Sequence, residues 1–423
     1  MGIICRQFLF ITIALIVGCP YQHPVVAQKN PKRIYIQNEK KKKVSIKFKY
    51  INNLIIIPVR INNSDTLNFI LDTGVSNTIL QSNNPSGQKP LKYSKDIMIN
   101  GLGEGKSLLA HHSIENDINI CGLVGEHQDI LVIEENELKL SNFLGIPIHG
   151  LIGYELFKDL IVEINYDQQF VTFNTHKKYK YKGNNRRQLA VPMIIENSKP
   201  YINAIITQSD SSELPVRVLL DLGASYAMWV NTQLAPTFKL PAQNAPAYLG
   251  FGLSGIVMGK IGRVPKVSID KFDFTNVLVS FPDTISLSYA AYQGNRHGSF
   301  GAEMLSRFNL IIDYRGQKLT LTPNGNYKRP FRTNMSGMEI STVIPGQPIY
   351  TVSYLQHVSP AHKAGLEVGD KIIQINGEQV SNLSISEITG LFIQRPGKKI
   401  HIRYNRNGVE KNTSFVLKDE LGN

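Results

Sequence analysis

Cysteine is scarce in this sequence, and its scarcity excludes a class of small extracellular proteins. Only Cys5, Cys19 and Cys121 occur among 423 residues, and the first two fall within an N-terminal leader. A chain with one remaining thiol is not a disulfide-stapled scaffold, and we expect Cys121 to be a small core residue. After the leader there is no run of about 20 apolar residues, so no transmembrane helix is predicted there.

Charged residues are also few, at 19%, whereas hydrophobic residues make up 42% of the chain. This balance excludes an intrinsically disordered protein, because enough apolar surface is available to form real cores. With about 150 residues per domain as a prior, the length predicts about three domains.

Acidic residues are scarcer than basic ones, and the formal net charge is +13. The excess is confined to two segments: residues 29–49 hold nine Lys or Arg and one acid, and residues 177–187 hold six and none. The remainder is nearly neutral, with 31 basic and 32 acidic residues. We therefore expect solvated tethers and no nucleic-acid partner. Adhesion of residues 40–43 to an anionic envelope surface is a weaker alternative.

The first 27 residues have the pattern of a secretory signal peptide. Arg6 precedes a ten-residue apolar stretch at 8–17, which is too short to span a membrane stably. Cleavage after Ala27 is favoured. A lipobox-like sequence ending at Cys19 offers a second processing site, at which Cys19 would carry a lipid anchor, and a retained signal anchor is a third alternative. Each predicts an exported protein that is periplasmic, bound to the cell envelope, or secreted.

A long internal repeat organises the next 280 residues. An apolar strand ending in Asp-x-Gly, a His-Gly-x-x-Gly segment and an Asn/Asp-Tyr pair each occur twice. The spacing from the Asp to the last Gly of the second segment is 81 residues in one copy and 80 in the other, which indicates duplication. The matching segments are residues 69–76 (FILDTGVS) and 218–225 (VLLDLGAS), 149–153 (HGLIG) and 297–301 (HGSFG), and 164–166 (INY) and 312–314 (IDY).

Each copy is expected to be mostly β-strand. Residues 44–50, 54–61 and 66–71 are rich in β-branched and aromatic residues, and short helices are predicted at 154–160 and 302–308. Beyond residue 336 the pattern changes to strands alternating with one amphipathic helix at about 384–394. The predicted organisation is a signal peptide at 1–27, a basic arm at 28–44, lobes at 45–176 and 189–323 joined by a basic connector at 177–188, a linker at 324–336 and a third domain at 337–420.

The repeated Asp-x-Gly segments predict a pair of carboxylates. A carboxylate directly after a buried strand is an unusual place for charge, and the following glycine allows a tight turn. A single such Asp would be read as a turn cap, but one in each of two duplicated lobes suggests that Asp72 and Asp221 meet. Two carboxyls about 3 Å apart share one proton. One can then accept a proton from water while the other polarises a carbonyl.

This arrangement resembles the aspartic proteases over about residues 45–325, and it is closer to the retropepsin-like branch because Val75 and Ala224 follow the two glycines. The resemblance implies a mainly β fold of two pseudo-symmetric barrel lobes with Asp72 and Asp221 as the catalytic pair. It also implies that Thr73, Gly74, Ser76, Gly223 and Ser225 support the active-site loops. His149 and His297 would line the substrate cleft, although purely local hydrogen bonding is an equal alternative. Gly103 and Gly252, in glycine-rich segments that we interpret as mobile hairpins, are further substrate-binding candidates, with plain surface turns as the alternative.

The second copy departs from the family pattern at Leu222, where the family has Thr or Ser. In the family the two hydroxyls hold the loops together across the lobe interface, and Leu222 cannot donate such a bond. We expect Thr73 to keep one half of this interaction and Leu222 to pack against apolar neighbours. The predicted function is therefore an aspartic endopeptidase, with a catalytically inactive peptide-binding scaffold of the cell envelope as the alternative.

A second resemblance lies near the C-terminus. Residues 359–377 (SPAHKAGLEVGDKIIQING) resemble the signature of PDZ domains, small α+β modules that bind extended peptides by strand addition. The expected peptide-binding loop includes Met338, Glu339 and Ile340. A negative charge at Glu339 would oppose a terminal carboxylate, so docking on the protease lobes is an alternative to peptide binding. No cofactor and no metal site are predicted, and the expected partners are peptide or protein substrates and a peptide ligand of the third domain.

Overall fold

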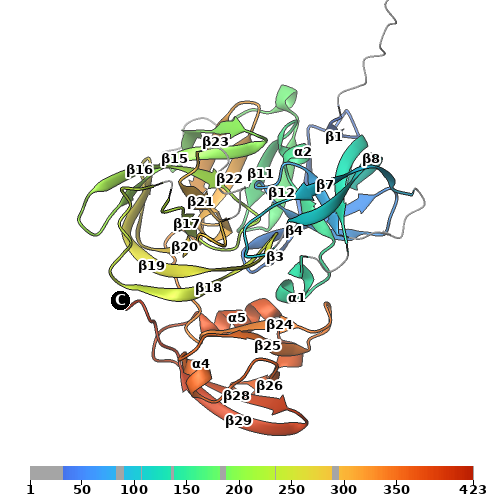
Figure 1. The fold of residues 1–423 in the computed structure, drawn as a ribbon. Helices are drawn as coiled ribbons and strands as arrows, with labels where there is room; N and C mark the ends of the chain where they lie inside the picture. The colour runs from blue at the N-terminus through green and yellow to red at the C-terminus, as the bar shows by residue number, and fades with distance from the viewer. Residues whose placement is uncertain are drawn as a thin grey trace, which may run out of the picture. The chain divides into compact units, whose positions relative to one another are not determined.

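The computed structural model describes residues 32–423, apart from residues 82–89, 106, 135–137, 182–186, 234, 288–294 and 423. Residues 32–423 form one compact unit, drawn as a ribbon in Figure 1. The predicted signal peptide and both of its processing sites, with Cys5 and Cys19, lie outside the described residues. Among the helices that the structure describes, none combines the length and the apolar character needed to cross a bilayer.

The first copy forms a nine-stranded sheet that positions its Asp-x-Gly loop. At its centre β10 runs parallel to β5 and antiparallel to β6, so the loop between β5 and β6 is fixed from both sides. The strands are β1 (Ile34–Ile36), β3 (Lys49–Ile51), β4 (Leu54–Ile61), β5 (Leu67–Leu71), β6 (Thr78–Gln81), β7 (Lys92–Ile99), β8 (Leu108–Ile120), β9 (Leu123–Ile133) and β10 (Gly150–Ile152), with helices α1 (Leu140–Leu144) and α2 (Tyr154–Phe157).

The second copy repeats this plan in an eight-stranded sheet. Here β21 runs parallel to β16 and antiparallel to β17, which gives the second Asp-x-Gly loop the same support as the first. The strands are β14 (Ile194–Glu196), β15 (Lys199–Thr207), β16 (Glu213–Leu220), β17 (Met228–Val230), β18 (Asn244–Gly252), β19 (Gly255–Ile269), β20 (Phe272–Pro282) and β21 (Gly298–Phe300), followed by helix α3 (Ala302–Leu305).

A six-stranded sheet built from both copies joins the two lobes. Its order is β13-β23-β22-β11-β12-β2, and Val162 of β11 pairs with Ile312 of β22 at the centre. Each copy thus contributes three strands, which fixes one lobe against the other through backbone hydrogen bonds. The strands are β2 (Lys43–Lys47), β11 (Ile161–Asn165), β12 (Phe170–Asn174), β13 (Leu189–Pro192), β22 (Phe308–Asp313) and β23 (Lys318–Pro323), with a 3-10 turn η1 at His176–Lys178.

The third domain is a small α+β unit with its own core. Helix α5 (Ile385–Phe392) begins at a capping box in which Ser384 and Glu387 bond each other's backbone, and it buries Ile385, Ile388 and Phe392. The remaining elements are β24 (Met338–Thr342), β25 (Tyr350–Leu355), α4 (Pro360–Lys363), β26 (Lys371–Ile375), β27 (Glu378–Gln379), η3 (Val380–Asn382), β28 (Lys399–Arg406) and β29 (Val409–Val416). The predicted fold class, two mainly β lobes followed by a small α+β domain, is confirmed.

Two expectations need correction. Part of the segment expected to be a solvated arm is folded, because β1 pairs with β9 at the edge of the first sheet, and Ile34 and Ile36 are buried there. Cys121 is exposed at the turn between β8 and β9 and is not a core residue.

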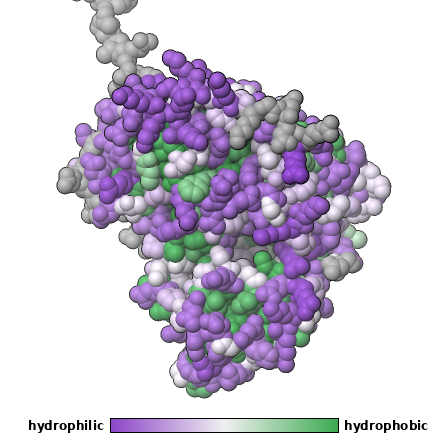
Figure 2. Space-filling view, turned by 180° about the vertical axis from the view of Figure 1, so that it is seen from behind, coloured by the Kyte–Doolittle hydropathy of each residue, from purple (hydrophilic) through white to green (hydrophobic). Residues whose placement is uncertain are grey.

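On the face drawn in Figure 2, hydrophilic side chains predominate and hydrophobic ones form separate patches.

Candidate active site

The two Asp-x-Gly loops begin at equivalent points of the two lobes. The backbone N–H of Asp72 donates to the carbonyl of Ile152 at 2.9 Å, and that of Asp221 donates to Phe300 at the same distance. Each aspartate therefore leaves the end of a buried strand while its backbone is still held by the central strand of the sheet. The strand register, and not the loop itself, therefore fixes the backbone position of each aspartate.

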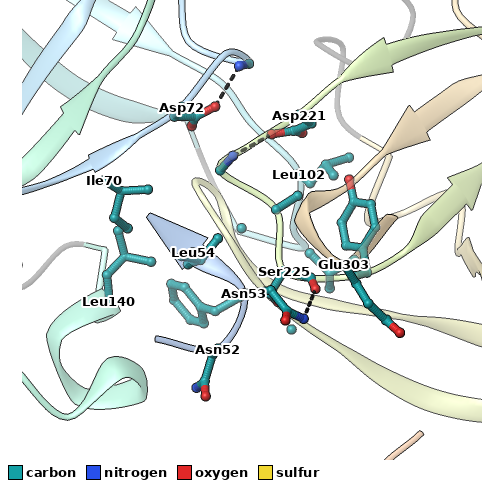
Figure 3. Close-up of a pocket in the computed structure, with 18 of the residues that line it drawn as sticks. Asn52, Asn53, Leu54, Ile70, Asp72, Leu102, Leu140, Asp221, Ser225 and Glu303 are labelled. Carbon is teal, nitrogen blue, oxygen red and sulfur yellow. Dashed lines mark hydrogen bonds between the residues drawn. The ribbon is translucent and has the colours of Figure 1, made fainter. Parts of the chain in front are cut away.

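The two carboxyl groups face one another. Oδ1 of Asp72 accepts a hydrogen bond from the Gly74 N–H at 2.6 Å, and Oδ1 of Asp221 accepts one from the Gly223 N–H at 3.1 Å (Figure 3). A Cβ placed on Gly74 would lie 3.0 Å from Oδ1 of Asp72 and 3.1 Å from Oδ1 of Asp221. Carboxyl oxygens from both lobes thus meet at a single glycine, as the repeat predicts.

Burial changes the acidity of this pair. It raises the pKa of Asp72, and the neighbouring charge of Asp221 raises it further. Burial also raises the pKa of Asp221, against the opposing effects of the Arg296 and Lys199 charges and a hydrogen bond to Asp72. Because two carboxylates this close resist double ionisation, the pair holds one proton over a wide pH range. One carboxyl can then act as an acid while the other acts as a base.

Thr73 holds the two loops together from one side only. Its hydroxyl donates to the carbonyl of Leu220 at 2.6 Å and accepts from the N–H of Leu222 at 3.0 Å. Leu222 is itself fully buried in the main core. The structure therefore has the expected hydroxyl interaction of Thr73. At the equivalent position of the second loop, the buried side chain of Leu222 makes apolar contacts instead.

Replacing Thr73 with Val tests this bridge. The substitution keeps the shape but leaves one buried carbonyl and one buried N–H without the hydroxyl, which costs about 2–6 kcal/mol of unfolding free energy at about 1–3 kcal/mol per group. Thr73→Ser keeps the hydroxyl and is the matched control. Chemical denaturation followed by fluorescence measures both variants. Equal stability of Thr73→Val and Thr73→Ser would contradict the bridge.

Two further hydrogen bonds cross between the lobes at the loops. The hydroxyl of Ser76 donates to the carbonyl of Asn197 at 3.1 Å, and the Asn53 side-chain amide donates to the carbonyl of Ser225 at 2.9 Å. Each loop is therefore tied to a hairpin turn of the opposite lobe. The sequence predicted that Ser76 and Ser225 support the loops, but it gave no signal for their partners Asn53 and Asn197.

The pair opens into a cleft of about 1300 Å³ that both lobes line. The two glycine-rich segments are hairpin tips, as expected, and they meet each other. The N–H of Ser254 donates to Leu102 at 3.0 Å, and the N–H of Gly105 donates to Ser254 at 2.6 Å. Gly252 lines the cleft, whereas Gly103 packs against the opposite tip, where a Cβ would collide with Gly255.

The two histidines do not have the cleft-facing role that the resemblance implied. Nδ1 of His149 accepts the backbone N–H of Asn68 at 3.0 Å, and Nδ1 of His297 accepts that of Arg217 at 2.9 Å. Each ring therefore accepts a backbone hydrogen bond from the adjacent strand, β5 for His149 and β16 for His297. Both rings make the local hydrogen bonds of the alternative, and neither is among the described residues that line the cleft.

Two functional candidates were missed from the sequence. Lys199 and Arg296 line the cleft, and their charges act on Asp221. Neither residue belongs to a recognisable motif. Arg296 directly precedes the repeated His-Gly segment, so a position-by-position comparison of the two copies was the signal that could have found it.

The predicted loop of the third domain is the edge strand β24. Met338 and Ile340 belong to the domain core, and Glu339 and Ile340 line the same cleft as the aspartate pair. Burial raises the pKa of Glu339 to about 7, although a hydrogen bond from Asn334 opposes this shift. A protonated Glu339 would not repel a ligand carboxylate. Below neutral pH its charge is therefore a weaker argument against binding of a peptide C-terminus.

The raised pKa of Glu339 makes a stability prediction. Because the folded pKa lies above the ordinary value of 4.5, the folded state keeps a proton that the unfolded chain has already lost. Stability is therefore full below pH 4.5 and falls as the pH rises through 7. Glu339→Gln should raise the thermal midpoint at pH 8 and leave it unchanged at pH 4, as calorimetry would detect. A similar change at both pH values would contradict this assignment.

In the part of the chain that the structure describes, no three His, Cys, Asp or Glu side chains gather as a set of metal ligands.

Comparison with known proteins identifies two regions. Residues 57–156 match the family model "Aspartyl protease", and residues 351–406 match the model "PDZ domain". The aspartic proteinase from Irpex lacteus has a TM-score of 0.43 and 14% sequence identity, covering 68% of this chain and 99% of that one.

Two curated proteins also align with part of the chain. The zinc metalloprotease RasP of Geobacillus kaustophilus is 24% identical over 192 residues, which are 38% of this chain and 43% of that protein. The carboxy-terminal processing protease CtpA of Bacillus subtilis is 39% identical over 63 residues, 15% of this chain and 14% of that protein. The alignments thus span less than half of either relative.

Proposed function

Since residues 57–156 are an aspartyl protease region and residues 351–406 a PDZ domain, we propose that the protein is an aspartic endopeptidase. The observation that carries the proposal is the meeting of Asp72 and Asp221 at the base of a cleft that both lobes line. Residues of both hairpin tips, Leu102 and Gly252 among them, line this cleft of about 1300 Å³.

In the proposed reaction, the ionised carboxyl takes a proton from a water molecule while the protonated carboxyl donates a hydrogen bond to the scissile carbonyl. The water oxygen forms a bond to the carbonyl carbon. The C–N bond then breaks as the leaving amine receives a proton from the pair. No covalent intermediate with the protein is formed, and no cofactor is needed.

An assay of the full exported chain against a peptide library, between pH 3 and 9, tests the proposal. Cleavage is expected at acidic to neutral pH. It should be lost as the pH rises past the upper pKa of the pair, since double ionisation removes the acid. A protein that cuts no peptide at any of these pH values would overturn the proposal.

The alternative is a peptide-binding scaffold of the cell envelope, and Leu222 is the observation that favours it. The half-bridge made by Thr73 supports the enzyme instead, because the two loops are still held in register. A scaffold would bind library peptides and release them intact, which mass spectrometry distinguishes from hydrolysis.

We also propose that the protein is exported to the periplasm or cell envelope, or secreted, because of its leader sequence. The PDZ domain is proposed to dock peptide segments of substrates or partners. The intact mass of the mature protein distinguishes cleavage after Ala27 from lipid attachment at Cys19.

A further inference from the structure

The two walls of the cleft differ in chemistry, although the two copies place equivalent strands there. On the first-copy side, Leu54, Ile70, Ile79 and Leu151 line the cleft and belong to one apolar cluster. Figure 3 shows Leu54 and Ile70 on the same side of the site as Asp72. These four side chains form an apolar part of the first wall.

Lys199 stands on the second wall where Leu54 stands on the first. Each residue follows a two-residue hairpin turn, 52–53 or 197–198, in which both residues have left-handed backbone angles. Each of these turns also makes the cross-lobe hydrogen bond to the opposite catalytic loop. The two positions are therefore equivalent, and both side chains line the cleft.

Arg296 stands where the first copy has Ile148. Each residue directly precedes a histidine, His297 or His149, whose Nδ1 accepts a backbone N–H from the neighbouring strand. Ile148 is buried in the apolar cluster of the first wall, whereas Arg296 lines the cleft. Two apolar positions of one wall are thus both cationic in the other.

Among the residues that the structure describes, neither Lys199 nor Arg296 forms an ion pair within 4.0 Å of a carboxylate. Arg296 is only 6% exposed, its guanidinium lies 5.1 Å from the ring centre of Trp229, and its Nε has no hydrogen-bond partner among the described residues. The charges that act on the Lys199 amine are those of Arg296, Asp221 and Asp72. Burial lowers the pKa of Lys199, and the Asp221 and Asp72 charges oppose this shift. The guanidinium of Arg296 is a positive charge that is almost fully buried. Burying such a charge is costly unless an anion pairs with it.

We propose that Lys199 and Arg296 form a subsite for a carboxylate of the substrate, so that the protease prefers peptides with Asp or Glu close to the scissile bond on the side of the second lobe. On the other side, the apolar wall would hold a large hydrophobic residue. This inference rests on the proposed endopeptidase function and names its substrate class.

The chemistry of the subsite explains why an acidic group is preferred over a neutral polar one. A carboxylate accepts charge-assisted hydrogen bonds from guanidinium and ammonium groups, and an amide of the same shape would leave both cations unpaired. Sites with buried polar groups reject ligands that fail to pair with them. We expect a preference of about 10- to 100-fold in kcat/KM, mainly through KM.

The test uses peptides that differ only by Asp against Asn, or Glu against Gln, at each position near the cleaved bond. Each is made with a free and with an amidated C-terminus, because a chain terminus also carries a carboxylate. The full-length protein is compared with Lys199→Met and Arg296→Gln, and Lys260→Met, an exposed lysine of β19, is the control. Both cations also affect the pKa of the aspartate pair, but the ratio between two peptides in one variant cancels that effect.

The wild type and Lys260→Met should prefer the acidic peptide at one position near the bond, with either C-terminus. Lys199→Met and Arg296→Gln should each lose most of this ratio, and Arg296→Lys should restore part of it. Equal cleavage of acidic and neutral peptides by the wild type overturns the inferred carboxylate subsite but leaves the proposed endopeptidase function in place. A preference only for free C-termini overturns the assignment to side chains, and failure to cut any peptide overturns the proposed function as well.

Discussion

Replacing either Asp72 or Asp221 with Asn lowers kcat/KM for peptide hydrolysis by at least about a thousandfold, because each carboxyl supplies one half of a coupled acid and base. An Asn at either position neither donates a proton nor removes one from water. The two single variants and the double variant should have nearly the same residual activity, since the pair acts as a unit.

The loss should not come from unfolding. Burial raises the pKa of both aspartates, so ionising the pair costs stability as the pH rises, and a neutral Asn removes that cost. We therefore expect thermal midpoints at pH 7 that equal or exceed the wild-type value. Asp283→Asn, at an exposed position next to the cleft-lining Pro282, is the control and should keep full activity. Asn variants that still cleave at the wild-type rate would exclude the aspartic mechanism.

The meeting of the two aspartates could be predicted because it depends on local sequence and on symmetry. Asp72 and Asp221 directly follow buried strands, and a duplicated chain folds equivalent strands into equivalent lobes. The one-sided hydroxyl bridge of Thr73 was predictable in the same way, since Leu222 has no hydroxyl to form the other half.

The features that could not be predicted depend on long-range contacts. Nothing local distinguishes Lys199 from the other lysines of the chain, and the pairing of β15 with β16, in which Tyr201 lies opposite Leu219, is what brings it near Asp221. For His149 and His297, the sequence left a cleft-facing role and local hydrogen bonding as equal alternatives, and Nδ1 of each ring accepts a backbone N–H from the neighbouring strand. The strand β1 was hidden because a short basic segment pairs with β9, a strand 90 residues later.

Substituting Ala at Gly223 should lower kcat about a hundredfold, whereas Ala at Gly74 should cost about tenfold or less. A Cβ on Gly223 would overlap Cγ and Oδ2 of Asp72, so the carboxyl must move. A Cβ on Gly74 would sit 3.0 Å and 3.1 Å from the nearest oxygens of Asp72 and Asp221, a tight contact that small shifts relieve. A displacement of about 1 Å in a catalytic group is enough for a hundredfold loss.

The two variants control for each other, because neither glycine has a positive φ and Ala therefore strains neither backbone. Both proteins should fold, and circular dichroism with thermal unfolding checks this. The difference should appear in kcat and in the pH profile, since a displaced Asp72 no longer shares its proton evenly with Asp221. Equal loss in the two variants would mean that the glycines matter only as loop residues and that the close approach of Gly223 to Asp72 does not shape the site.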